Sequence, residues 1–221
     1  MKQQVIERFE KELSFLISEL YEINSYSLLY KHLYNKKNKP EFLKAMNRAP
    51  AFFGLTIHSY QRMFILGLSK ICEKRNPKGK NIFSFLTFLE GHHSMIFSNI
   101  SSKKQNSIDY TVIALHKIEL ENHSNCIENL LAWRDKSYAH YDKKYIGDNI
   151  QTLGNDFPIT YGEIERLINS LGEILNTYQS AFNDTVTHLV PSNTYDVDIV
   201  LNALLNNKNH STSMNDSSAS L

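Results

Sequence analysis

The sequence predicts an all-α protein. Its 221 residues contain only eight glycines and five prolines, so a few long elements are favoured over many short strands. Apolar residues recur at three- and four-residue steps in several segments, which is the spacing of one face of a helix. No segment alternates apolar and polar residues over any length, as a half-exposed strand would. We therefore expect a helical bundle.

The composition is that of a soluble globular chain, with 42% hydrophobic and 21% charged residues. The 24 lysines and arginines almost balance the 23 acidic residues, which leaves a formal charge of +1. A protein that grips a long duplex by its phosphates normally carries a basic excess. This balance argues against non-specific duplex binding and leaves room for a local site that holds one or two phosphates.

The cysteines and the N-terminus point to the cytoplasm. Cys72 and Cys126 lie in apolar helical surroundings without a CxxC or Cys/His spacing, so we expect buried free thiols of a reducing compartment. The N-terminus is charged and lacks the apolar run of a signal peptide, and no apolar run approaches the length of a membrane span. We expect a cytoplasmic protein with no membrane contact.

The first part of the chain predicts helices over residues 1–48, expected to pack on the main bundle. An amphipathic helix runs through 5–23, a weaker periodic stretch follows at 28–34, and a lysine-rich loop precedes a short helix at 41–47.

The main helical domain is predicted over 49–190. Its first helix, 51–74, is apolar nearly all round, so we expect it at the centre of the bundle. Gly54 and Gly67 inside it weaken the helix by roughly 1 kcal/mol each. We expect the close approach of a neighbouring helix to compensate.

The later helices follow the same spacing. They are predicted at 82–89, 108–120 and 125–144, then, after a loop at 147–158, at 160–182, with a short C-terminal helix at 195–205 inside the segment 191–206. Thr160 and Glu163 have the spacing of a capping box. The polar residues 207–221 cannot bury anything, so we expect a disordered tail.

Arg134 is the physical anomaly of the sequence. On a regular helix over 125–144 it falls in the middle of an apolar face, where a guanidinium is costly unless it is paired. The simplest explanation is a buried acid such as Glu73 or Glu128. His140 follows six residues later, about 9 Å along the axis and roughly a third of a turn around it. The two side chains can meet on one phosphate if the helix distorts near His140, or if a twofold partner supplies a second set.

These residues carry a family resemblance. The string Arg134-Asp135-Lys136-x-x-Ala139-His140-x-Asp142 resembles the R-x4-6-H motif of HEPN domains, in the branch found among phage abortive-infection proteins. The segments 68–71 and 81–86 also resemble the helix that precedes the motif in that branch. The resemblance covers roughly residues 51–186 and implies a HEPN-like helical bundle, usually dimeric, that cuts RNA without a metal or other cofactor in phage defence or as a toxin.

The resemblance also implies roles for the residues of the motif. Neutral His140 can accept the proton of a ribose 2′-hydroxyl, Arg134 can hold the scissile phosphate, and Asp135 can orient either of them. RNA-binding contacts are expected from neighbouring lysines and tyrosines, namely Lys136, Lys143 and Lys144 on phosphates and Tyr141, Tyr138 or Tyr145 on a base.

Other readings stay open. The chain can instead be a non-catalytic HEPN-like module that dimerises or binds RNA or a partner protein, and a cognate antitoxin is a further possible partner. In the toxin branch that is modified on a Tyr two residues after the His, the corresponding residue here is Asp142, so that regulation is not carried over. The histidines offer no metal site, because the neighbours His92 and His93 point apart on a helix and no carboxylate or Cys completes His116 with His123. Phosphate-loop, dinucleotide and nucleophile-elbow motifs are absent from the sequence.

Overall fold

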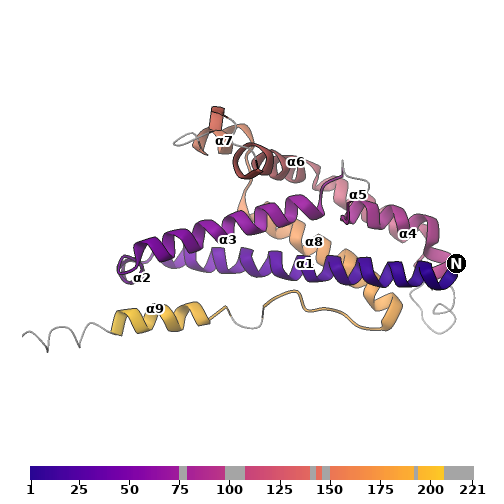
Figure 1. Ribbon diagram of the computed structural model, residues 1–221, viewed down its shortest axis with the longest axis horizontal. Coiled ribbons are helices and arrows are strands. Elements are labelled where there is room, and N and C mark those ends of the chain that lie inside the picture. Colours follow the sequence, from indigo (N-terminus) through magenta and orange to yellow (C-terminus); the bar gives the residue numbers. More distant parts are fainter. Residues whose placement is uncertain (75–78, 98–107, 140–142, 146–149, 192–193, 207–221) are drawn as a thin grey trace, which may run out of the picture. The chain divides into compact units, whose positions relative to one another are not determined.

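The computed structural model describes residues 1–74, 79–97, 108–139, 143–145, 150–191 and 194–206. Every regular element within these residues is a helix, which confirms the predicted all-α class (Figure 1). The chain forms two compact units, Met1–Asn24 with Phe64–Val190, and Ser25–Met63 with Pro191–Leu221. Helices α1 (Lys2–Lys37) and α3 (Pro50–Ile71) contribute residues to both units.

The first unit holds most of the helices and the predicted site. Besides the parts of α1 and α3, its elements are α4 (Ile82–Phe97), α5 (Tyr110–Asn122), α6 (Ser124–Trp133), the π-helical turn η1 (Arg134–Ala139), the 3-10 turn η2 (Lys143–Tyr145), α7 (Ile150–Asp156) and α8 (Tyr161–Asn183). Helix α4 packs on α5, and α4, α5 and α6 all contact α8.

An aromatic cluster fills the core of this unit. The Phe9 ring of α1 lies 5.9 Å from Phe85 and 5.0 Å from Phe182, measured between ring centroids. Tyr178 of α8 meets Phe85 edge to face at 5.7 Å. Aromatic pairs at these separations stabilise a core beyond the area that they bury. The cluster therefore ties α1, α4 and α8 together.

Helix α8 forms as the sequence predicts. The Thr160 hydroxyl accepts a hydrogen bond from the Glu163 N–H at 3.2 Å, and the Glu163 carboxylate accepts one from the Thr160 N–H at 2.7 Å. This is the predicted capping box. The helix ends at Asp184, which takes the left-handed conformation with φ of 62°.

The two glycines of α3 differ. A Cβ atom at Gly67 would lie 2.5 Å from Cγ1 of Ile23, so the predicted close approach of a second helix is confirmed there. At Gly54 a Cβ atom would meet no described residue within 4 Å beyond the neighbouring part of its own helix, so the same expectation is wrong at that position.

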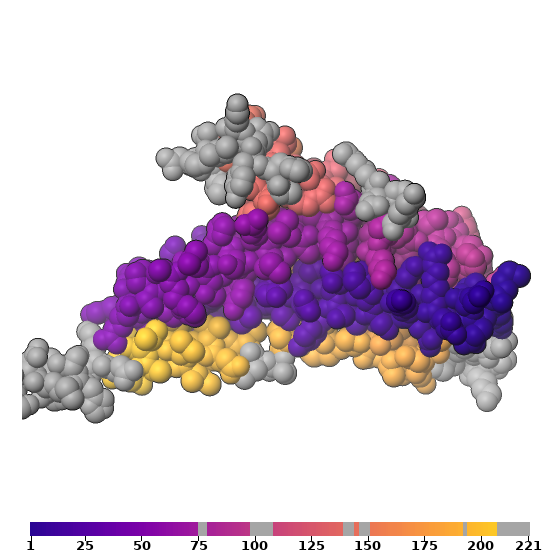
Figure 2. All heavy atoms as spheres, in the orientation of Figure 1, coloured from indigo at the N-terminus to yellow at the C-terminus, as the bar shows by residue number. Residues whose placement is uncertain are grey.

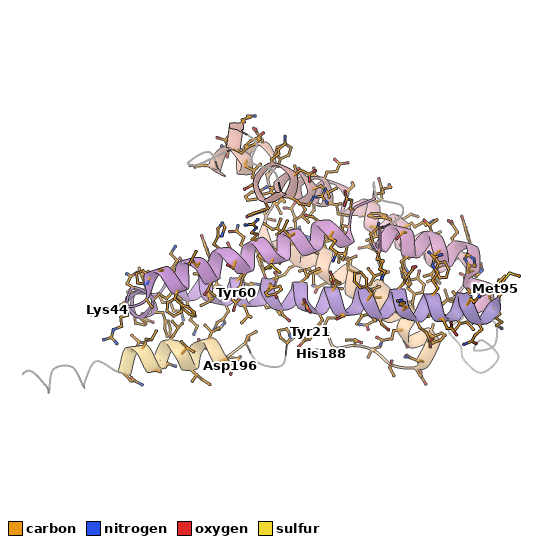
Figure 3. The ribbon with its side chains drawn as sticks, viewed as in Figure 1. Tyr21, Lys44, Tyr60, Met95, His188 and Asp196 are labelled. Atoms are coloured by element: carbon orange, nitrogen blue, oxygen red, sulfur yellow. The ribbon has the colours of Figure 1, made fainter. Side chains whose placement is uncertain are left out.

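The second unit is built on a small apolar core. Helix α2 (Pro40–Met46) packs against α9 (Asp196–Asn206), as the purple and yellow atoms in Figure 2 show. Figure 3 marks α2, α3 and α9 of this unit by the labels Lys44, Tyr60 and Asp196. The buried residues of its core are Leu33, Ala45, Met46, Phe53 and Leu201.

Polar contacts hold α9 in the second unit. Asp198 accepts a hydrogen bond from the His32 ring at 3.0 Å and pairs with Lys36 at 2.7 Å. The Arg48 guanidinium donates to the carbonyl oxygen of Leu204 near the other end of the helix. These contacts therefore hold α9 at its first turn, through Asp198, and near its last turn, through Leu204.

Several predicted boundaries are wrong. The segments 5–23 and 28–34 belong to the single helix α1, and the predicted loop at 147–158 contains α7. The regular helix over 125–144 ends at Trp133 and continues as the π-helical turn η1. Helix α3 is not covered on all sides, since Leu55 is 69% exposed.

The predictions for the cysteines, for a membrane span and for the C-terminal tail can be compared with the structure. Cys72 and Cys126 are buried free thiols, as predicted. Among the described residues, no helix combines the length and the apolar character that a membrane span needs. The predicted tail at 207–221 lies outside the described residues.

Candidate active site

The backbone changes geometry at Arg134. The Arg134 N–H still bonds to carbonyl oxygens of α6, at Leu130 and Leu131, and the π-helical turn η1 begins with this residue. Short π-helical segments are rare and occur frequently at functional sites. Of the predicted site residues, Arg134, Asp135 and Lys136 lie on this turn.

Arg134 is held by two carboxylates. Its Nη1 and Nη2 donate to the two carboxylate oxygens of Glu73 at 2.9 and 3.2 Å, and its Nε donates to Asp135 at 2.7 Å. The Arg134 side chain is 19% exposed and the Glu73 side chain 28%. The hydrogen bond that Arg134 donates to Asp135, followed by those it donates to Glu73, raises the pKa of Arg134 above its usual range. Of the two buried acids that were expected as simple partners, Glu73 and Glu128, Arg134 binds Glu73, which is only partly buried.

This pairing fixes the guanidinium between two helix ends. Glu73 comes two residues after the end of α3, and Arg134 comes directly after α6. A bidentate arginine–carboxylate pair sets distance and plane together. Arg134 is therefore positioned by contacts with both segments.

The guanidinium keeps part of its donor capacity. Arginine has five N–H groups, and three of them make these bonds. Among the residues that the structure describes, no partner accepts from the remaining N–H on Nη1 or on Nη2. One cation and two carboxylates give this cluster a formal charge of −1, so Arg134 alone does not attract a phosphate.

The predicted RNA-binding residues are only partly brought to this turn. The Lys136 ammonium lies 5.4 Å from the centre of the Tyr145 ring. Lys144 pairs with Asp156 at 2.6 Å, and this hydrogen bond, followed by that from Tyr145, lowers the pKa of Asp156. Tyr145 is 6% exposed and its hydroxyl donates to Asp156 at 2.9 Å, so its ring is not open to a base.

The other motif residues lie outside what is described. His140, Tyr141 and Asp142 are not among the described residues, and neither is the side chain of Lys143. The approach of His140 to Arg134 remains a prediction.

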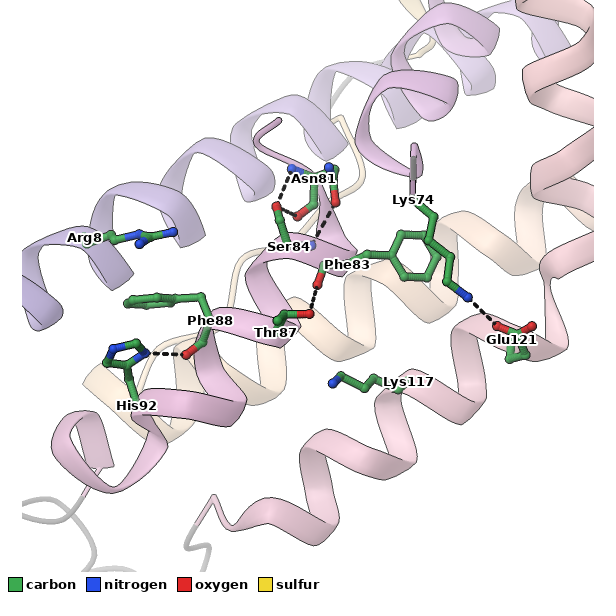
Figure 4. Close-up of a pocket in the computed structure, with 10 residues that line it drawn as sticks. All are labelled: Arg8, Lys74, Asn81, Phe83, Ser84, Thr87, Phe88, His92, Lys117 and Glu121. Atoms are coloured by element: carbon green, nitrogen blue, oxygen red, sulfur yellow. Dashed lines mark hydrogen bonds and ion pairs between the residues drawn. The ribbon is translucent and has the colours of Figure 1, made fainter. Parts of the chain in front are cut away.

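A groove beside this region was missed by the sequence analysis. It has a volume of about 510 Å³ and is bounded by α1, α4, α5 and the residues after α3 (Figure 4). The side chains that line it are Arg8, Lys74, Asn81, Phe83, Ser84, Thr87, Phe88, His92, Lys117 and Glu121.

One signal of this groove exists in the sequence. Ser84, Phe88 and His92 are spaced by four residues, and Phe83 and Thr87 repeat that step beside them. Such residues share one face of a helix. Nothing in the sequence indicates that Arg8 and Lys117 lie opposite that face.

The histidines on α5 and after it have protein partners. His116 Nδ1 and the Tyr178 hydroxyl are 2.8 Å apart, and burial lowers the pKa of His116. His123 contacts the Ser170 hydroxyl at 2.9 Å. In the part of the chain that is described, no group of three or more His, Cys, Asp or Glu side chains is arranged to hold a metal ion.

The family model HEPN_AbiU2, described as AbiU2, matches residues 6–202. The match spans most of the chain, so the protein belongs to this family. No curated protein and no solved structure matches significantly. The predicted family resemblance is confirmed, and it extends further toward the N-terminus than residue 51.

Proposed function

We propose that this HEPN-type abortive-infection protein is a metal-independent endoribonuclease that acts in phage defence or as a toxin. Arg134, Asp135 and His140 form its active site. The observation that carries the proposal is Arg134, a cation fixed by two carboxylates on a π-helical turn inside a domain of this family.

The chemistry requires no group beyond the RNA and these side chains. His140 removes the proton of a ribose 2′-hydroxyl, and the oxygen attacks the adjacent phosphorus. The bond to the 5′-oxygen of the next nucleotide breaks, which leaves a 2′,3′-cyclic phosphate. The leaving oxygen takes up a proton from water or from the protonated His140. Arg134 offsets the negative charge that builds up on the phosphate oxygens as the 2′-oxygen attacks.

Glu73 and Asp135 position the arginine for this role. Their bonds fix the plane of the guanidinium and leave one N–H on each Nη nitrogen for a phosphate oxygen. Because the three side chains together carry a charge of −1, nearby lysines must draw the substrate. Lys136, which follows Asp135 on the same turn, is suited to this, and Lys143, Lys144 and Tyr141 complete the proposed RNA contacts.

The active species is a homodimer in this proposal. Arg134 and His140 are six residues apart, and the turn that begins at Arg134 is π-helical, so regular α-helix geometry does not set how the two side chains meet. The homodimer is what the family resemblance implies. A twofold partner that supplies a second pair brings two arginines and two histidines to one cleft. A cognate antitoxin or another defence protein is a possible further partner.

One observation favours a second function. The bidentate pair with Glu73 satisfies Arg134 within the chain, as expected of a structural arginine. In this alternative the protein is a non-catalytic HEPN-like module for dimerisation, RNA binding or protein interaction.

An RNA cleavage assay with three variants separates the two functions. Arg134→Ala and Glu73→Gln both break the same ion pair, so they disturb the fold in the same place. If Arg134 acts on the phosphate, Arg134→Ala lowers the cleavage rate by about 100-fold or more. Glu73→Gln keeps an acceptor for the guanidinium and lowers the rate by less than about 10-fold. His140→Ala removes the base and also abolishes cleavage.

The contrary result is equally clear. Equal losses in Arg134→Ala and Glu73→Gln, in proportion to their loss of stability, would mean that the arginine is structural. RNA cleavage by a nuclease-free preparation that persists in His140→Ala would contradict the role of His140 as the base.

A further inference from the structure

The groove between α1, α4 and α5 has the size of a small-molecule site. Its volume of about 510 Å³ lies inside the range of roughly 300–1,000 Å³ that is common for ligand sites. All the residues that line it belong to the first unit. Its lining combines aromatic rings with cationic side chains, seen in Figure 4.

The aromatic part offers one ring to a ligand. Phe88 is already covered, because the Arg8 guanidinium lies 4.3 Å from its ring centre and the His92 ring stacks on it at 4.7 Å. Phe83 is half-buried, and the Lys74 ammonium is 5.6 Å from its ring centre. A planar base can stack on such a ring whatever its identity.

The cationic part suits a phosphate. Three cations, Arg8, Lys74 and Lys117, and one carboxylate, Glu121, line the groove. The carboxylates Glu12 and Glu90, which pair with Arg8 and Lys117, bring the formal charge of the whole set to zero with His92 neutral, so a phosphate binds here by displacing a carboxylate. The first end of α4, marked by Asn81 and Ser84 in the lining, adds the positive end of a helix dipole.

Each cation has a carboxylate partner that a phosphate can replace. Arg8 pairs with Glu12 at 2.7 Å, and Lys117 pairs with Glu90 at 2.6 Å. Lys74 pairs with Glu121 at 3.3 Å, and both of these side chains are about two-thirds exposed. Exposed pairs of this kind contribute little to stability. Lys74 is therefore the cation most easily taken over by a ligand.

The groove continues toward Arg134. A smaller pocket of about 170 Å³ shares Lys74, Phe83 and Glu121 with it and reaches Leu131 on α6. Lys74 directly follows Glu73, the residue that binds Arg134. Through Lys74 the groove therefore adjoins the segment that holds Arg134.

We infer that this groove binds a nucleotide, with its base on Phe83 and its phosphate on Lys74 and Lys117. The same chemistry is offered by a free nucleotide and by a nucleotide within single-stranded RNA. The inference deepens the proposed function. It rests on that function in one respect, namely that the RNA bound in the groove is also the RNA that the protein cuts.

The test measures binding on the full chain in a His140→Ala background, so that RNA stays intact. A fluorescently labelled single-stranded RNA of about 12 nucleotides, a usual length for such sites, is titrated while its anisotropy is recorded. Adenosine monophosphate is then added as a competitor. The variants are Phe83→Leu, Lys74→Gln and Lys117→Gln.

The chain supplies matched controls. The Lys70 ammonium lies 5.5 Å from the centre of the Phe15 ring, so these two residues form a pair like that of Lys74 and Phe83. The pair belongs to the same unit, and neither residue lines the groove. Phe15→Leu and Lys70→Gln therefore reproduce the local changes without touching the groove.

Phe83→Leu should weaken RNA binding by about 5- to 100-fold. Each lysine variant should lower the slope of log affinity against log salt by about 0.7. The controls should bind as the parent does. Competition by adenosine monophosphate identifies the free nucleotide as a ligand, and binding of RNA without competition identifies a nucleotide within a strand. Both support the inference.

The failure of this inference differs from failure of the nuclease. If Phe83→Leu and Lys74→Gln bind RNA and adenosine monophosphate as their controls do, or if the parent binds neither, the nucleotide groove is refuted, whatever the cleavage assay gives. If the groove variants lose binding while the unmutated chain cuts no RNA, the groove stands and the nuclease proposal falls.

Discussion

Helix α8 and the segment formed by α6 and η1 look alike in sequence and differ in structure. Both carry an apolar stripe at helical spacing. In α8 the stripe is uninterrupted, and one regular helix runs from its capping box at Thr160 to the left-handed Asp184. In the other segment the stripe contains Arg134, and the α-helix gives way to a π-helical turn at that residue. The difference teaches that one charge in an apolar stripe marks the place where both geometry and partners change.

The largest expected effect tests the apolar side of this comparison. Leu171 of α8 is fully buried, so Leu171→Ala removes packing and leaves a cavity. We expect the free energy of unfolding to fall by about 3 kcal/mol, measured by urea denaturation. Leu115→Ala on the exposed side of α5 is the control and should change it by less than about 0.5 kcal/mol. A small effect at Leu171 would mean that α8 does not anchor the core.

A smaller effect tests the charged side. Arg134→Ala and Glu73→Ala should each destabilise the chain, and the double variant should lose less than their sum. We expect a coupling energy of about 1–2 kcal/mol, between the values usual for exposed and for buried pairs, because both side chains are partly exposed. The measurement is a double-mutant cycle of unfolding free energies. Additive losses would show that the pair does not connect α3 to η1.

The smallest effect concerns how α8 begins. Thr160→Ala removes the hydroxyl that accepts from the Glu163 N–H, and we expect a loss of about 1 kcal/mol of stability. Thr160→Ser keeps the oxygen and should stay close to the parent in the same urea experiment. If both variants lose equally, the methyl group rather than the cap stabilises the helix start.

Much of the fold could be predicted because it follows local patterns. The stripe and capping box of α8 are encoded by neighbouring residues, and the tight packing at Gly67 follows from the absence of a side chain. Helix α7 was missed because seven residues give too little periodicity; it depends on burial of Leu153 against the rest of its unit. The exposed Phe52 and Leu55 of α3 show that periodicity does not tell which apolar faces become covered.

The candidate site divides in the same way. Arg134 stood out because a charge within an apolar stripe needs a partner, but the sequence left Glu73 and Glu128 as alternatives, and only the fold selects Glu73. The groove could not be predicted, because Arg8, Lys74 and Lys117 come from segments far apart in sequence and only the fold brings them together.

Cys72 places a chemical probe beside the Arg134–Glu73 pair. It is fully buried, directly precedes Glu73, and burial raises its thiol pKa far above the usual range. Burial likewise raises the pKa of Cys126, to about 11. A thiol reagent attacks the thiolate, so Cys72 reacts only when the end of α3 opens. The rate of alkylation therefore reports how often the native protein releases that end, without any introduced label.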